Sequence, residues 1–102
     1  MAEYITVGPS DAVAEGTIVQ FSVGGEPIAV ANVAGSLHAF HDTCTHAMCS
    51  LAEGDLEENA VECACHGSRF DVTTGEVLNG PATDPVSTYP VRVADEGLQI
   101  EA

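Results

Sequence analysis

The strongest constraint on this chain is a stretch of cysteines and histidines near its middle. Two short groups, Cys44-Thr45-His46 and Cys63-Ala64-Cys65-His66, each offer a thiolate and an imidazole, and residues 47–62 separate them. Both ligand types bind zinc or iron. Zinc modules usually leave two or more residues between paired ligands, whereas the first group leaves one. The stretch therefore indicates a metal site, with structural zinc as the alternative to iron.

The order and spacing of the two groups resemble those of Rieske-type [2Fe-2S] proteins, in which Cys-x-His precedes Cys-x-x-His. The resemblance extends to Gly67-Ser68 and to Gly80-Pro81-Ala82, which is similar to the loop that covers such clusters.

This resemblance implies one [2Fe-2S] cluster and its four ligands. Cys44 and Cys63 would hold the inner iron, while His46 and His66 would hold the outer iron. Two thiolates and two neutral imidazoles leave the oxidised cluster neutral, so an electron is added more easily than with four thiolates. Such centres lie at roughly −150 to +300 mV, against about −400 mV for plant-type clusters. The imidazoles are the expected exit for electrons.

All four cysteines lie within this stretch, and Cys49 and Cys65 remain after the ligands are assigned. In Rieske proteins of quinol-oxidising complexes, a disulfide joins cysteines at these two positions, so the resemblance implies a Cys49–Cys65 bridge. Disulfides are unusual in the cytoplasm. Two free buried thiols are therefore the alternative.

The resemblance also implies residues that tune or shield the cluster. Ser68 stands where high-potential relatives place a hydroxyl that bonds a bridging sulfide, with an ordinary turn hydroxyl as the alternative. Phe70 stands where those relatives have a tyrosine, and it cannot donate a hydrogen bond. We expect a potential below that of the quinol-linked group. Met48 is expected to shield the cluster, and Pro81 to restrict the covering loop.

The rest of the chain has strand patterns and no clear helical period. We predict an all-β fold: an antiparallel sandwich or barrel with a small inserted cluster-binding subdomain at about 42–83, in a single domain of 1–102. The resemblance implies the same fold. The predicted strands are 4–7, 17–23, a return strand through residues 28–33, 37–41, 55–56, 61–62, 70–72, 76–78, 89–93 and 97–100.

The charge balance restricts the partners of this protein. Sixteen acidic residues face two arginines and no lysine, for a net charge of −14, which disfavours nucleic acid and anionic membranes. The acidity fits either solubility or steering toward a basic redox partner. The first residues have neither a signal-peptide pattern nor an apolar span, so we expect a soluble, cytoplasmic protein. We also expect it to be a monomer.

Other polar residues near the motif are expected to have ordinary roles. Arg69 should form a surface salt bridge, His38 and His41 should be structural or solvent-facing, and Asp42 should be a solvated loop charge.

We therefore predict a one-electron carrier and not an enzyme. By resemblance, its partners would be a flavin-dependent NAD(P)H reductase and a terminal oxygenase of aromatic compounds. The alternatives are a redox-sensing or structural metal module, and a small Rieske subunit of a quinol, arsenite or nitrite enzyme.

Overall fold

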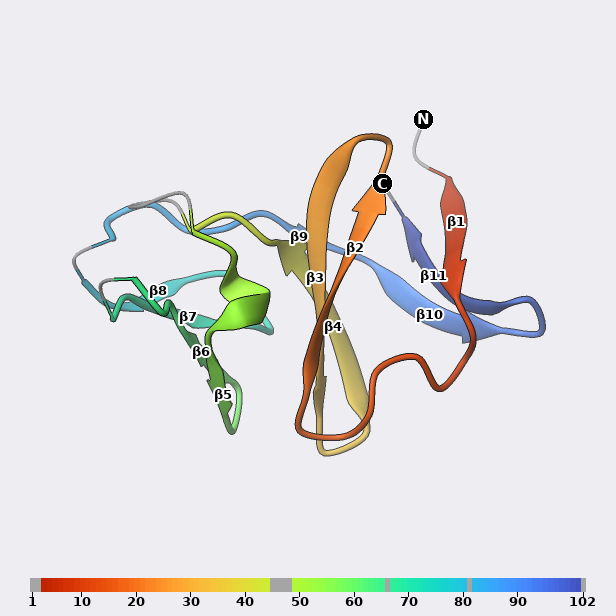
Figure 1. Ribbon diagram of the computed structural model, residues 1–102, viewed down its shortest axis with the longest axis horizontal. Coiled ribbons are helices and arrows are strands. Elements are labelled where there is room, and N and C mark those ends of the chain that lie inside the picture. Colours follow the sequence, from red (N-terminus) through yellow and green to blue (C-terminus); the bar gives the residue numbers. More distant parts are fainter. Residues whose placement is uncertain (1–2, 45–48, 66, 81, 102) are drawn as a thin grey trace.

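The computed structural model describes residues 3–44, 49–65, 67–80 and 82–101, and antiparallel strands dominate these ranges (Figure 1). The prediction of an all-β antiparallel fold is confirmed. Within the described ranges, no helix has the length and apolar character needed to cross a membrane. The elements are β1 (Tyr4–Gly8), β2 (Ile18–Val23), β3 (Glu26–Val33), β4 (Ser36–His41), the 3-10 helix η1 (Leu51–Glu53), β5 (Asp55–Glu57), β6 (Ala60–Glu62), β7 (Arg69–Asp71), β8 (Val77–Asn79), β9 (Thr88–Tyr89), β10 (Val91–Ala94) and β11 (Gly97–Glu101).

The strands form three sheets. Their orders are β1-β11-β10, β2-β3-β4-β9 and β5-β6-β7-β8, and all pairs are antiparallel. Figure 1 shows the β2-β3-β4-β9 sheet in the middle, with the β5–β8 sheet on one side and the three-stranded sheet on the other. The middle sheet therefore supports the unit that follows Asp42 in the chain.

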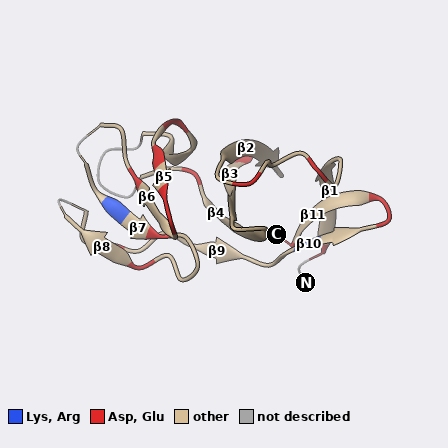
Figure 2. Ribbon diagram, turned by 90° about the horizontal axis from the view of Figure 1, so that it is seen from below, with Lys and Arg blue, Asp and Glu red and all other residues tan. Residues whose placement is uncertain are grey.

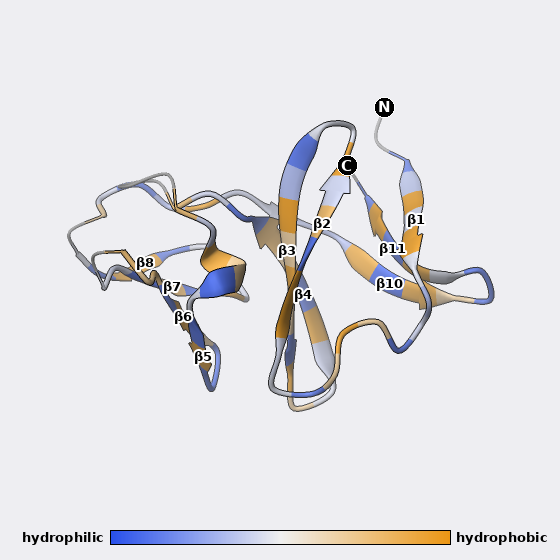
Figure 3. Cartoon of the chain, viewed as in Figure 1, coloured by the Kyte–Doolittle hydropathy of each residue, from blue (hydrophilic) through white to orange (hydrophobic). Residues whose placement is uncertain are grey.

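Strand β3 is buried on both faces, because its side chains alternate between two hydrophobic cores. Ile28 and Val30 pack in the core shared with the three-stranded sheet. Ala29 and Ala31 face the other core, which also contains Cys44 and Cys63. The middle of β3 is correspondingly apolar in Figure 3. Small alanine side chains on that face leave room for the sulfur-bearing loops to pack close to the sheet.

One predicted strand is wrong, because residues 89–93 are not a single strand. The chain pairs with β4 through β9, passes Pro90, and then pairs with β11 as β10. Proline has no N–H for a strand ladder. Pro90 therefore lies where the chain leaves the β2-β3-β4-β9 sheet for the β1-β11-β10 sheet.

Candidate metal centre

The first cysteine loop follows β4. Thr43 and Ser50 form an antiparallel bridge, and the Cys44 N–H donates a 2.8 Å hydrogen bond to the Cys49 carbonyl. The loop is therefore closed at its base, with the Cys44 side chain fully buried. The predicted ligand His46 and the predicted shield Met48 lie outside the described residues.

The second loop is delivered by the β5–β6 hairpin and has a matching closure. Cys63 follows β6 directly, and its N–H donates to the Ser68 carbonyl at 2.7 Å. In each loop the bond joins a cysteine to the residue five positions later. Cys63 is 2% exposed. The predicted ligand His66 lies outside the described residues.

The cysteines divide into two kinds. Cys49 and Cys65 form a disulfide, the bridge that the resemblance implied, whereas Cys44 and Cys63 are free and buried. The Cys63 sulfur lies within 4.8 Å of both disulfide sulfurs. Because the disulfide leaves two thiols in the chain, these residues cannot supply four thiolates. The donor chemistry fits a cluster that takes two thiolates and draws its other ligands from histidine.

Ser68 connects the second loop to the segment that returns to the base. Its side chain is fully buried, and its Oγ accepts a 3.0 Å hydrogen bond from the Ala82 N–H. A hydroxyl that accepts one bond can still donate its own hydrogen. Phe70 is also fully buried and packs in the core that contains both free cysteines. Pro81, in the expected covering loop, lies outside the described residues.

The prediction that Asp42 is a solvated loop charge is wrong. Its side chain is 1% exposed. It accepts hydrogen bonds from Gln20 Nε2 at 2.5 Å, Ser50 Oγ at 2.6 Å and the Ala52 N–H at 2.8 Å. These donors lie far along the chain or across a loop, so no local pattern could identify them.

Arg69 forms the surface salt bridges expected of it. Its Nη2 lies 3.6 Å from a Glu57 carboxylate oxygen, and its Nε lies 4.0 Å from one of Glu62. These three side chains are partly to mostly exposed, so the pairs contribute little to stability. Figure 2 shows the blue segment at β7 close to red positions on β5 and nearby loops. Acidic residues therefore surround Arg69, which is the only basic residue in strands β5 to β8.

Asp71 ends β7 and organises the turn that follows. Thr73 donates to Asp71 Oδ1 from its hydroxyl at 2.6 Å and from its N–H at 2.8 Å. The Thr73 hydroxyl is the largest cause that lowers the pKa of Asp71 below its usual value, with smaller contributions from backbone N–H groups and Asn59 outweighing burial. The ionised carboxylate therefore stabilises this turn.

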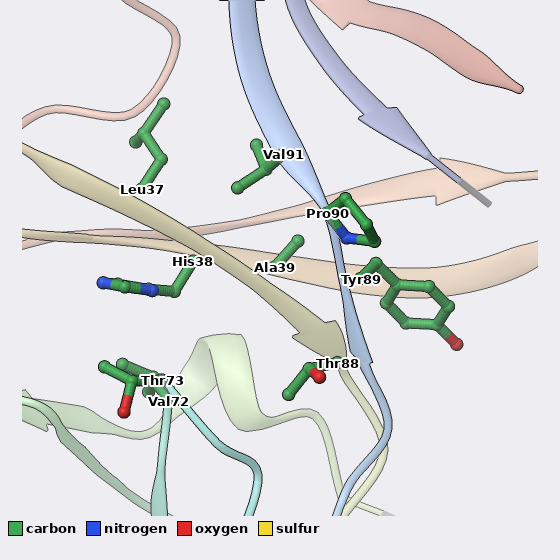
Figure 4. A pocket seen from close by; sticks show the side chains of 9 residues that line it. All are labelled: Leu37, His38, Ala39, Val72, Thr73, Thr88, Tyr89, Pro90 and Val91. Carbon is green, nitrogen blue, oxygen red and sulfur yellow. The ribbon is translucent and has the colours of Figure 1, made fainter.

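A groove of about 320 Å³ lies between β4 and the Val72-Thr73 turn (Figure 4). His38 is the one imidazole among the described residues that line it, beside apolar and hydroxyl side chains. His41 instead accepts from the Thr43 N–H at Nδ1 and contacts Glu26 through Nε2 at 3.2 Å. His41 therefore has the structural role predicted for it, and the described residues that line the groove include no carboxylate beside His38.

Comparison with known proteins places these loops in a family. Residues 3–90 match the Rieske [2Fe-2S] domain. The chain is 35% identical over 100 residues to the anthranilate 1,2-dioxygenase ferredoxin subunit of Burkholderia cepacia, covering 98% of this chain and 93% of that protein. Among solved structures, the Sphingomonas yanoikuyae B1 ferredoxin has a TM-score of 0.91 at 29% identity, covering 98% and 99% of the two chains. A chain in the complex of reduced oxygenase and oxidised ferredoxin of carbazole 1,9a-dioxygenase has a TM-score of 0.88 at 34% identity, covering 96% and 92%.

Two free, buried thiols near a small β-sheet unit, together with these relatives, indicate the class of iron–sulfur electron carriers. This chain belongs to the Rieske [2Fe-2S] family. It carries one [2Fe-2S] cluster and transfers electrons, and it is not itself a catalyst.

Proposed function

We propose that this protein passes single electrons from an NAD(P)H-dependent flavin reductase to an oxygenase that hydroxylates aromatic rings. The observation that carries the proposal is full-length similarity to ferredoxin components of such oxygenases, including those named for anthranilate and naphthalene. The two buried thiols beside a disulfide support a cluster of the same kind.

We assign four ligands to the cluster: the thiolates of Cys44 and Cys63, and the imidazoles of His46 and His66. The cluster supplies reversible one-electron chemistry at a potential above that of four-cysteine ferredoxins. The chain supplies two closed loops, and the packing of Leu51, Val61 and Phe70 with the cysteines excludes water from the thiol side. Residues 42–83 form the cluster-binding subdomain of a single domain.

The tuning residues act on the same centre. Ser68 keeps one hydrogen available for a bridging sulfide, because its oxygen already accepts from the Ala82 N–H. Phe70 offers no hydroxyl to a ligand sulfur. The chain thus has the Ser68 hydroxyl but lacks a tyrosine hydroxyl at position 70. This combination supports a midpoint potential between those of the lowest Rieske centres and those of the quinol-linked ones. Met48 would shield the cluster, and Pro81 would restrict the covering loop.

The cellular setting follows from the proposed partners. A reductase that uses NAD(P)H works in the cytoplasm, so we place this protein there, as a monomer. The Cys49–Cys65 disulfide must then persist in a reducing compartment, with Cys49 half-buried and Cys65 exposed.

The proposal is tested by reconstitution. Purified protein should contain two irons and two sulfides per chain and give a Rieske-type EPR signal when reduced. It should then support NADH-driven oxidation of an aromatic substrate by the reductase and oxygenase of a related system, such as the biphenyl system. A Cys63→Ser variant serves as the control without a cluster. Colourless, zinc-containing protein would overturn the electron-carrier proposal, and slow reduction by every reductase would favour a redox sensor.

A further inference from the structure

Asp42 has a position that the electron-carrier function does not by itself explain. It lies at the exit of β4, two residues before Cys44, and its carboxylate is 1% exposed. A carboxylate buried to this degree is costly unless several donors satisfy it. The hydrogen-bond donors that satisfy the Asp42 carboxylate therefore indicate its role.

The donors come from two parts of the fold. Gln20, on β2, donates from Nε2 to Asp42 Oδ2 at 2.5 Å. Ser50 donates to the same oxygen at 2.6 Å, and the Ala52 N–H donates to Oδ1 at 2.8 Å. One carboxylate thus joins the middle sheet to the chain that leaves the first cysteine loop.

The backbone of Asp42 makes the same connection. Its N–H donates to the Pro27 carbonyl of β3 at 3.0 Å, and its carbonyl accepts from the Leu51 N–H at 2.6 Å. Residues 43–50 between these contacts are closed by the Thr43–Ser50 bridge and by the Cys44–Cys49 hydrogen bond. Both ends of the first cysteine loop are therefore attached to the sheet at Asp42.

We propose that Asp42 is a positioning residue for the first cluster loop. Its carboxylate holds Ser50 and Ala52 against Gln20, and through the closed loop it fixes Cys44 and the disulfide residue Cys49 relative to the middle sheet. A fixed loop holds the ligand geometry constant between redox states and limits access to the iron. This inference rests on the proposed cluster ligation by Cys44.

The test uses Asp42→Asn in the cluster-loaded protein. The new amide nitrogen cannot accept a hydrogen bond, so it opposes either the Ala52 N–H or the Gln20 amide. We expect iron release to a chelator to become roughly tenfold faster, as for other groups that orient metal ligands. The EPR signal of the reduced protein should also broaden or shift.

Asp71→Asn is the matched control. Asp71 likewise accepts from a backbone N–H, a hydroxyl and an asparagine amide, and its donors, Thr73 and Asn59, lie outside both cysteine loops. It should lower stability without changing the EPR signal or the rate of iron release. If the Asp42 and Asp71 variants behave alike, the positioning role is overturned.

A double variant keeps the test informative if Asp42→Asn fails to load. Gln20→Glu combined with Asp42→Asn reverses the donor and acceptor across the 2.5 Å contact, so it should recover the EPR signal and slow iron release. No recovery would overturn the inference. If the unsubstituted protein gives no Rieske-type signal, the proposed function fails instead, so the two failures are distinguishable.

Discussion

Ser68→Ala separates two roles of one hydroxyl, because stability and redox potential report on different bonds. The Ser68 Oγ is fully buried and accepts from the Ala82 N–H at 3.0 Å. Its removal leaves that N–H without its acceptor, which costs roughly 1–3 kcal/mol of unfolding free energy. This loss is expected whether or not the hydroxyl also contacts the cluster.

The potential reports on the hydrogen that Ser68 donates. A bond to a sulfide becomes stronger when the cluster gains an electron, and a difference of about 1 kcal/mol corresponds to roughly 40 mV, since about 1.4 kcal/mol equals 59 mV for one electron. We therefore expect the midpoint potential to fall by roughly 40 mV in protein-film voltammetry.

The control for this experiment is Thr73→Ala. It removes another hydroxyl that makes a short hydrogen bond, at 2.6 Å to Asp71, and should lower stability without moving the potential. An unchanged potential in Ser68→Ala, together with lower stability, would refute the reasoning. Ser68 would then be an ordinary turn hydroxyl that holds only Ala82.

Four further outcomes are expected. Replacing both Cys49 and Cys65 with serine should lower the unfolding free energy by about 3 kcal/mol, because the bridge closes a loop of 16 residues, while iron analysis still finds the cluster. Gly75→Ala should destabilise more than Gly16→Ala in thermal melts. Both glycines have φ of +81°, so both substitutions carry about 1–3 kcal/mol of backbone strain, but only at Gly75 would a Cβ collide with a backbone carbonyl. Because the folded-state pKa of Asp71 is lowered, its stabilisation is complete above its unfolded value of 3.8 and is lost as pH falls through the folded value, so the stability difference from Asp71→Asn should shrink at acid pH. Finally, because the net charge is −14, the rate of reduction by a reductase with a basic docking face should fall as salt is added. A rate that does not change with salt would exclude electrostatic steering.

Much of the fold was readable from local patterns. The β5–β6 hairpin follows alternating apolar residues and turn residues and was predicted near its observed bounds, as was β11 of the closing hairpin. The break at Pro90 was missed, because strand-forming residues flank the proline on both sides. Its effect depends on which sheet each flank joins, and a local pattern does not carry that information.

The ligand types and their spacing in the sequence were enough to predict a metal site, because they restrict the metal chemistry before any folding is considered. Tertiary structure decided which thiols remain free, since the Cys49–Cys65 bridge requires the two cysteine loops to lie side by side. It also decided the role of Asp42, whose donors lie on β2 and beyond the first loop. An aspartate looks the same in a sequence whether it is solvated or buried, and only the packing of distant segments supplies the donors that make burial favourable.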